Sequence, residues 1–238
     1  MSQNGERMPN SFRVVWRKRS GLSVVVLVGA LALSGCGSER LLSVQFNDER
    51  VGSPPAIDQE VGRCRTGDFG TVRIEHLPGG GGGNWVQLTQ AQQLAPPAKL
   101  RCSFVAFRGD GRYLVTMRLF IPSGNSASIL FQSGGFDPPD FFRVDFPDTG
   151  LLHRPGSTAI AGRFPRDQVF SVAVNFNIGA TSTAEVTLLG PAHGSFVTDV
   201  PHTITNDEHN FSAIQLTTDV RKTGSTFLAN DLSVIYNH

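Results

Sequence analysis

The chain has 238 residues, enough for one sizeable domain or two small ones. It carries 21 Lys and Arg residues against 20 Asp and Glu, and five of the basic residues and one of the acidic ones lie within the first 35 positions. Without that segment, 16 basic and 19 acidic residues remain, a net charge near −3. Nucleic acids select basic surfaces, so this charge argues against a nucleic acid partner.

The amino-terminal segment has the layout of an export signal. Arg13, Arg17, Lys18 and Arg19 form a positive region, and the 13 residues 21–33 that follow carry no charge. A helix of that length rises about 20 Å, which is too short for a hydrocarbon core of roughly 30 Å. The length suits the apolar region of a cleavable signal peptide, and the basic flank disfavours the alternative of a buried core helix.

A short motif ends this apolar segment. Residues 33–36 read Leu-Ser-Gly-Cys and resemble the lipobox of bacterial lipoprotein precursors. The resemblance implies that the thiol of Cys36 receives a diacylglyceryl group and that the chain is cut just before it. Gly37 stands where Asp would mark retention in the inner membrane, so the family's sorting rule points to the outer membrane in a cell that has one. Several acyl chains hold a protein on a bilayer without a spanning helix.

The two other cysteines predict a disulfide. Cys64 and Cys102 are an even pair in an exported, oxidising compartment. Closing their 38-residue separation would stabilise the fold by about 3–4 kcal/mol on the chain-entropy account. Two separately buried thiols are the alternative, and a metal site is disfavoured because no His or Cys stands at ligand spacing from either residue.

These features predict a signal peptide over residues 1–35, a lipidated cysteine with a short tether over 36–40, and one domain over 41–238. In that domain apolar residues alternate with period two, and helical periodicity is scarce. Many short strands separated by Gly, Pro and Asn turns predict an all-β fold, a two-sheet antiparallel jelly-roll sandwich. The predicted strands are 41–46, 71–76, 85–89, 99–107, 112–120, 128–132, 141–146, 168–177, 184–189, 211–217 and 227–236. The five glycines 79–83 lack the Lys-Ser/Thr of a phosphate-binding loop and are expected to connect a hairpin.

Both ends of the domain carry a second resemblance. Residues 46–48 (Phe-Asn-Asp) with the turn at 51–55, and the closing stretch 223–234, resemble the first and last strands of bacterial concanavalin A-like (laminin-G-like) jelly-roll domains. The resemblance implies that these strands pair and that acidic residues there hold a structural Ca²⁺. Asp48, Asn230 and Asp231 would supply three of its six to eight oxygen ligands, with solvated charges as the alternative. No other cofactor is expected.

Catalytic motifs are scarce in the sequence. None of the Glu residues forms the Glu-x-Asp-x-x-Glu strand of glycoside hydrolases with this fold. The six His residues are scattered; residues 193–195 (His-Gly-Ser) are expected to lie in a loop, and 207–209 (Asp-Glu-His) in a solvated turn. An enzyme is therefore disfavoured.

The alternation also predicts a ligand site. With Val86 and Leu88 in the core, their neighbours on the strand face outward, and the same reasoning applies to two other strands. An outward Trp stacks on the apolar side of a sugar while charged groups bind hydroxyls; the alternative places the Trp under the glycine loop as ordinary core. The predicted ligand residues are Trp85, Gln87, Arg118, Phe141, Arg143 and Asp145.

The resulting hypothesis is an exported, lipid-anchored envelope protein that touches the membrane through its anchor. Its domain would be a lectin-like binding or adhesion module for a glycan or an envelope component. Fold resemblance carries this hypothesis, so it is an analogy. A divergent glycan hydrolase or lyase, and a structural protein that binds another envelope protein, are the alternatives.

Overall fold

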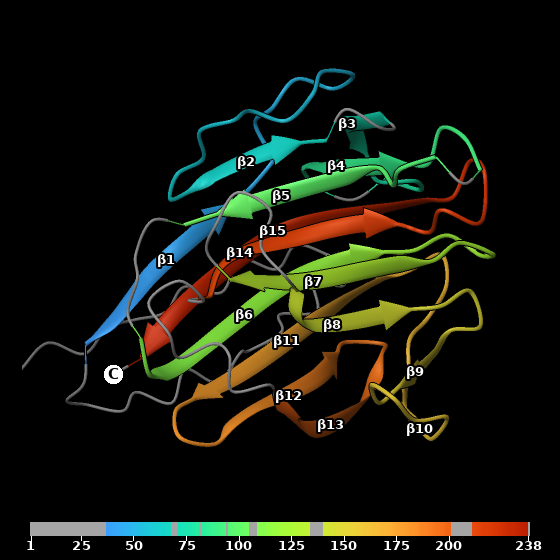
Figure 1. The fold of residues 1–238 in the computed structure, drawn as a ribbon. Helices are drawn as coiled ribbons and strands as arrows, with labels where there is room; N and C mark the ends of the chain where they lie inside the picture. The colour runs from blue at the N-terminus through green and yellow to red at the C-terminus, as the bar shows by residue number, and fades with distance from the viewer. Residues whose placement is uncertain are drawn as a thin grey trace, which may run out of the picture. The chain divides into compact units, whose positions relative to one another are not determined.

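The computed structural model describes residues 37–67, 71–80, 82–93, 95–104, 109–133, 140–200 and 211–237. These ranges contain fifteen β-strands and no helix (Figure 1). It follows that no helix in them is long and apolar enough to cross a membrane. The predicted signal peptide, Cys36 and the turn at 207–209 lie outside the described residues.

The strands form two antiparallel sheets, which confirms the predicted sandwich. The five-stranded sheet lies towards the viewer in Figure 1. Its order is β2 (Arg63–Thr66), β5 (Lys99–Ser103), β14 (Phe211–Thr218), β7 (Ala127–Ser133) and β8 (Asp140–Phe146). The ten-stranded sheet has the order β3 (Thr71–His76), β4 (Asn84–Thr89), β15 (Thr226–Asn237), β6 (Gly111–Phe120), β11 (Val169–Ile178), β12 (Ser182–Leu189), β13 (His193–Val200), β10 (Ile160–Arg163) and β9 (Leu151–His153), with β1 (Ser38–Val44) paired to β15.

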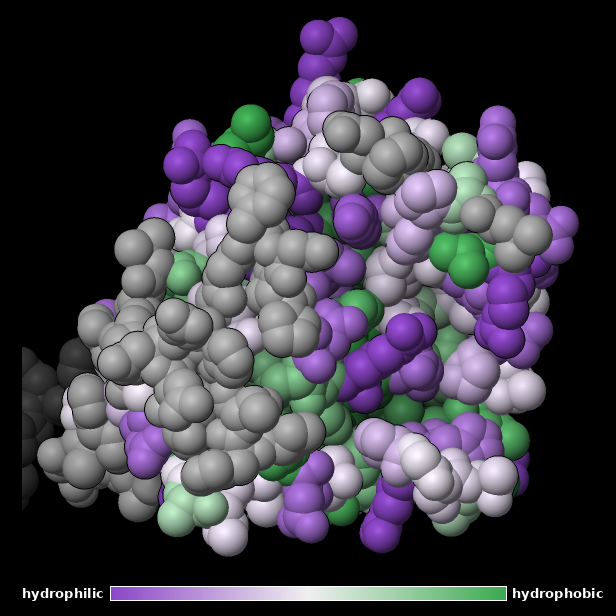
Figure 2. Space-filling model, viewed as in Figure 1, coloured by the Kyte–Doolittle hydropathy of each residue, from purple (hydrophilic) through white to green (hydrophobic). Residues whose placement is uncertain are grey.

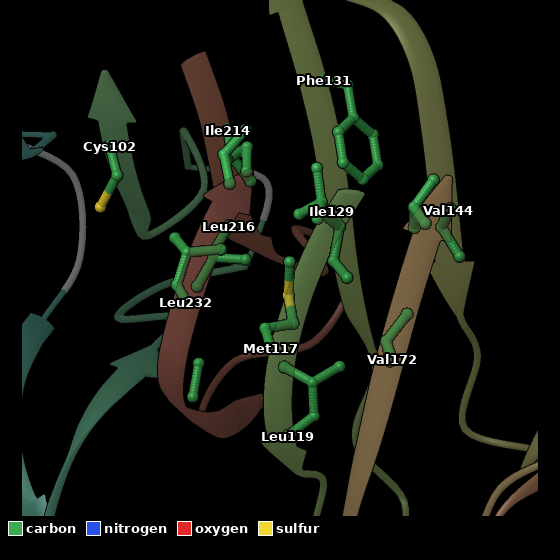
Figure 3. Packing of buried hydrophobic residues seen from close by; sticks show 14 of the residues in the cluster. Cys102, Met117, Leu119, Ile129, Phe131, Val144, Val172, Ile214, Leu216 and Leu232 are labelled. Carbon is green, nitrogen blue, oxygen red and sulfur yellow. The ribbon is translucent and has the colours of Figure 1, made fainter. Parts of the chain in front are cut away.

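One hydrophobic core fills the space between the sheets (Figure 3). Alternate residues of two long central strands enter it as predicted: Tyr113, Val115, Met117 and Leu119 from β6, and Phe170, Val172, Val174 and Phe176 from β11. From the other sheet Phe131 packs its ring against that of Phe176, with centroids 4.9 Å apart. In β6 and β11, alternate residues from Tyr113 to Leu119 and from Phe170 to Phe176 face the core while their neighbours face away from it, and this alternation positions the site described below.

The predicted disulfide is confirmed. Cys64 and Cys102 lie opposite each other on β2 and β5, and both are buried. The bond fastens β2, the edge strand of the five-stranded sheet, to its only neighbour in that sheet. The glycine run also has its predicted place, because β3 and β4 pair antiparallel on either side of it.

Four strands were not predicted. β2, β9 and β10 have only three or four residues each, too few to display a period-two pattern. The fourth is β13, so residues 193–195 begin a strand and are not a loop. The stretch 193–200 shows no clear period-two alternation, because Gly194 and mostly exposed polar residues surround Phe196 and Val200, which are buried in the core. Strand β5 is shorter than predicted and ends at Ser103.

Candidate functional site

The six predicted ligand residues do not come together. Trp85, Gln87 and Arg118 lie on the outer face of the ten-stranded sheet, because their strand neighbours Val86, Leu88 and Met117 belong to the core. Arg143 and Asp145 lie on the outer face of the five-stranded sheet, where both are half exposed. The two groups are thus on opposite sides of the sandwich and cannot bind one small ligand.

The predicted outward orientation of Phe141 is wrong. Its ring lies in the core against Phe176 and Phe211, with 8% of its surface exposed. The cause is an irregular register between β7 and β8: Phe131 faces Phe142, but Gln132 faces Asp140, so one extra residue is inserted. A β-bulge of this kind breaks the alternation, and both Phe141 and Phe142 reach the interior.

Trp85 faces outward and is nevertheless completely buried. It packs with Phe120 and Leu228 in a small cluster separate from the main core, and Leu77, at the start of the glycine-run connection, packs against this cluster. The guanidinium of Arg118 lies 5.0 Å from the centre of the indole ring. Trp85 is therefore buried, as in the alternative, but it lies on the far side of the sheet from the main core and not within it.

The predicted calcium ligands on β15 are engaged with protein groups. Asn230 is buried; its Oδ1 accepts hydrogen bonds from the backbone N–H groups of Phe46 and Asp231, and its Nδ2 donates to Asn47 Oδ1 and the Asn84 carbonyl. Together these bonds use both ends of the amide.

The neighbouring carboxylate is engaged as well. Asp231 has a positive φ of 52° at an irregularity in the β15–β6 register, and its carboxylate accepts from Arg118 at 3.0 Å. Asp48 is exposed. In the described ranges no group of three or more His, Cys, Asp or Glu side chains could hold a metal ion. Calcium binding by Asp48, Asn230 and Asp231 stays a prediction, and the observed contacts do not favour it.

The outer face of the five-stranded sheet carries a groove of about 500 Å³. Its floor is made by β7, β8 and β14, the last three strands of the sheet order β2–β5–β14–β7–β8. Figure 2 shows this face from the same side as Figure 1, with hydrophilic side chains around a hollow in which hydrophobic atoms are visible. The residues that line it and are used below are Ser128, Leu130, Arg143, Asp145, Gln215 and Thr217. Two smaller depressions, of about 340 and 250 Å³, lie on the ten-stranded sheet.

Hydrogen bonds hold the polar groups of the groove in place. The carboxylate of Asp145 accepts from the Ser128 hydroxyl at 2.5 Å and from Arg143 Nε at 2.7 Å, and Arg143 Nη2 donates to the same hydroxyl oxygen at 3.0 Å. Ser128 and Asp145 are direct partners in the sheet register, so the backbone fixes this triangle. The Arg143 guanidinium is thereby oriented before any ligand arrives.

The loops at one end of the groove are also tied down. Arg166 donates to the carbonyls of Asn125 and Pro147, and Asn125 Oδ1 accepts from the backbone N–H of Thr226. Arg166 is partly buried, and this burial lowers its pKa from the usual arginine value. Because Pro147 lines the groove, this network sets the shape of that end.

The rim of the groove carries a second ion pair. Arg221 Nη2 lies 2.7 Å from Asp219 Oδ2. Hydrogen bonds from Arg221 lower the pKa of Asp219 and outweigh the opposing effect of burial. At neutral pH this carboxyl is therefore ionised and has no proton to donate, which makes it unsuitable as the general acid of a glycosidase.

Most of the groove was missed in the sequence. Ser128, Gln215 and Thr217 occupy outward positions that period-two alternation does indicate, since Ile129, Ile214 and Leu216 enter the core. The sequence did not show that β14, β7 and β8 are neighbours. That adjacency depends on the order of strands in the sheet.

No family model and no curated protein matches the chain, but solved structures do. The chain is similar to the catalytic domain of a glycoside hydrolase family 131 protein from Coprinopsis cinerea, with a TM-score of 0.54 and 13% identity over 82% of this chain and 94% of that one. It is also similar to lectin UEA-II in complex with galactose, from Ulex europaeus, with a TM-score of 0.51 and 8% identity over 84% of this chain and 100% of that one.

A sialidase matches as well, with a TM-score of 0.50 and 12% identity. That match covers 73% of this chain but spans only 16% of the sialidase's length. At these identities the similarity establishes the fold alone, and the chain has the jelly-roll architecture shared by lectins and carbohydrate-active enzymes.

Proposed function

We propose that this protein is a lipid-anchored envelope protein whose jelly-roll domain binds a glycan in the groove of the five-stranded sheet. The observation that carries the proposal is the groove itself, in which polar side chains from three adjacent strands converge over about 500 Å³. Solved structures of the same architecture include a lectin in complex with galactose and a glycoside hydrolase domain, which supports a carbohydrate ligand.

The groove has the chemistry that a sugar requires. Gln215 offers an amide group that can both donate and accept hydrogen bonds, whereas Ser128 and Thr217 are buried in the groove floor and the Ser128 hydroxyl already donates to Asp145. Leu130, opposite Gln215 in the register, is buried in the groove floor with 7% of its surface exposed, and this small apolar surface can contact the C–H face of a sugar ring. Arg143 supplies a charged donor that is already fixed by Ser128 and Asp145, so little conformational entropy is lost when it binds a ligand.

The anchor is proposed from the lipobox. If Cys36 carries acyl chains, Cys36→Ser should abolish processing of the precursor. The protein should also lose its lipid-dependent association with the membrane. The measurement is the partition of the expressed protein between aqueous and detergent phases, with globomycin treatment accumulating the uncut form. A processed, membrane-bound Cys36→Ser protein would contradict the anchor and leave the groove unaffected.

The groove is tested on the protein starting at Gly37, which contains every described strand and the disulfide. A glycan array followed by calorimetry should identify a ligand, and Arg143→Ala should weaken its binding by about tenfold or more, because a hydrogen bond from a charged group is lost. Arg73→Ala is the matched control, since Arg73 is an exposed arginine on the outer face of β3 in the opposite sheet. Equal affinity in both variants, with unchanged melting curves, would place the site elsewhere.

A further inference from the structure

The outer face of the five-stranded sheet carries more basic than acidic side chains, and the groove lies at one end of it. We infer that the ligand of this groove is a polysaccharide that carries carboxylates, a polyuronate, bound along a row of side chains that crosses the sheet. This inference rests on the proposed glycan-binding function and names its substrate class.

The register of the four strand pairs defines the row. Arg65 on β2 lies opposite Arg101 on β5, and Arg101 lies opposite Gln215 on β14. Gln215 in turn lies opposite Leu130 on β7, which lies opposite Arg143 on β8. Strands in a sheet are about 4.8 Å apart, so the row extends roughly 19 Å from Arg65 to Arg143. The groove occupies the end with Gln215, Leu130 and Arg143, and the two other arginines continue the same line to the opposite edge of the sheet.

The two neighbouring rows each hold one basic and one acidic residue, so the excess positive charge of this surface comes from the arginines of the central row. One contains Lys99, Thr217, Ser128 and Asp145, and the other contains Arg63, Ser103, Ala213, Gln132 and Asp140. The three rows together hold five basic and two acidic residues, whereas residues 36–238 as a whole carry a net charge near −3. Basic residues are thus concentrated on one face, and such a face attracts anions through its local field.

The carboxylates on this face already bind neighbouring side chains of the protein. Asp145 binds Arg143 and Ser128, and Asp140 accepts a hydrogen bond from Gln132 Nε2, whose Oε1 accepts from Arg101 Nε. At the β2 edge Arg63 is paired with Asp58 at 2.9 Å. In the row itself Arg65 and Arg101 are adjacent, and Gln215 and Leu130 separate Arg101 from Arg143.

This spacing fits a linear, charged sugar chain. Guanidinium groups bind planar carboxylates through two parallel hydrogen bonds, and the amide of Gln215, between Arg101 and Arg143, suits the sugar hydroxyls between carboxylates. A single-stranded nucleic acid is the other extended polyanion, but it binds through aromatic stacking as well as charge, and none of the three rows contains an aromatic residue. The rows favour the uronate polymer.

The experiment compares charged and uncharged forms of the same oligosaccharide. Hexamers of galacturonate, glucuronate, mannuronate and guluronate, each beside its methyl ester, are titrated into the protein starting at Gly37 by calorimetry. We expect at least one uronate hexamer to bind about tenfold or more tightly than its ester. Its affinity should fall as NaCl is raised, because salt screens exposed charges.

Variants in the cationic row locate the charge recognition. Arg65→Gln and Lys99→Gln should each weaken uronate binding by up to about fivefold, as expected for an exposed ion pair, and Arg73→Gln should leave it unchanged. Arg65 and Lys99 lie outside the residues that line the groove, so their loss should leave binding of an esterified hexamer as it was.

The outcomes separate this inference from the function on which it rests. An ester or neutral hexamer that binds as tightly as the uronate, and loses binding with Arg143→Ala, would overturn the uronate specificity while the glycan site stands. No binding by any charged or neutral glycan would overturn the proposed function. Tighter binding of single-stranded DNA or of anionic lipid vesicles through Arg65 and Lys99 would also overturn the uronate assignment.

Discussion

Truncating Trp85 separates its structural role from a role in binding. The indole ring is fully buried on the outer side of the ten-stranded sheet, covered by Phe120, Leu228 and Leu77, with Arg118 over its face. Its Nε1 is also buried and donates no hydrogen bond to any of the described residues. Two substitutions at this position should therefore have very different costs.

The magnitudes follow from what each substitution removes. Trp85→Ala removes the whole ring from a closed cluster and should cost about 3–5 kcal/mol of unfolding free energy. For a domain of roughly 200 residues this corresponds to a fall in Tm of about 10 °C. Trp85→Phe loses packing contacts, which should lower the unfolding free energy by about 1 kcal/mol. It also removes a buried N–H that has no partner, and this should raise the unfolding free energy, because burying such a group costs about 1–3 kcal/mol. The two effects offset, so Trp85→Phe should lie within about 1 kcal/mol of the original protein.

Urea unfolding followed by circular dichroism measures both variants. Trp16 and Trp85 are the two tryptophans of the chain, so in the protein starting at Gly37 Trp85 is the sole fluorophore of its kind. Its emission should be that of a buried indole in the native state and should move to longer wavelength on unfolding. If Trp85→Phe costs as much as Trp85→Ala, the indole N–H has a partner in solution and the reasoning is refuted. Glycan affinity should be unchanged by Trp85→Phe, since the groove lies on the other sheet.

Two further predictions concern stability. Replacing Cys64 and Cys102 together by Ala should lower the unfolding free energy by about 4 kcal/mol, the chain-entropy value for a 38-residue loop; a difference below 1 kcal/mol in urea unfolding would contradict this role. The lowered pKa of Asp219 means that its pairing with Arg221 stabilises the fold above the ordinary carboxyl pKa and ceases to do so as the pH falls through the folded value. Arg221→Gln should therefore lower Tm at pH 7, and the difference from the original protein should shrink below about pH 4; a constant difference would argue against the pairing.

Alternation predicted the core positions of β6 and β11 well. In β6 and β11 every second residue is apolar and buried, because both strands run through the middle of the large sheet with one face on the core. The same reasoning failed at Phe141, where an inserted residue shifts the alternation by one. Such an insertion is specified by the partner strand and is not visible in the strand's own sequence.

The candidate site was predictable only in part. Alternation correctly turned Trp85 and Arg143 out of the core, but it could not show that they belong to different sheets. It also could not show that Leu77, eight positions before Trp85, packs against the small cluster that buries the indole. Both facts depend on contacts between segments, and the groove residues on β14 and β7 come from strands almost 80 positions apart.

The pairing of β1 with β15 bears on how a ligand would reach the protein at a membrane. Ser38, the first residue of β1, stands only two positions after Cys36 and lies opposite Asn237 at the end of β15. An acylated Cys36 would thus be joined to the domain by a linker of about 7 Å, too short for the domain to move far from the lipid headgroups.

The groove lies at the opposite end of β15. Thr226, at that end of the twelve-residue strand, donates a backbone hydrogen bond to Asn125 beside the groove, roughly 35–40 Å from Asn237 along the strand. In Figure 1 the groove ends of β14 and β8 likewise lie at the far end of the strands from the start of β1. Strand β15 would then act as a rigid spacer. Its C-terminal end would lie near the bilayer, and the groove would lie at the distance from the membrane that polymers extending outward from the surface reach.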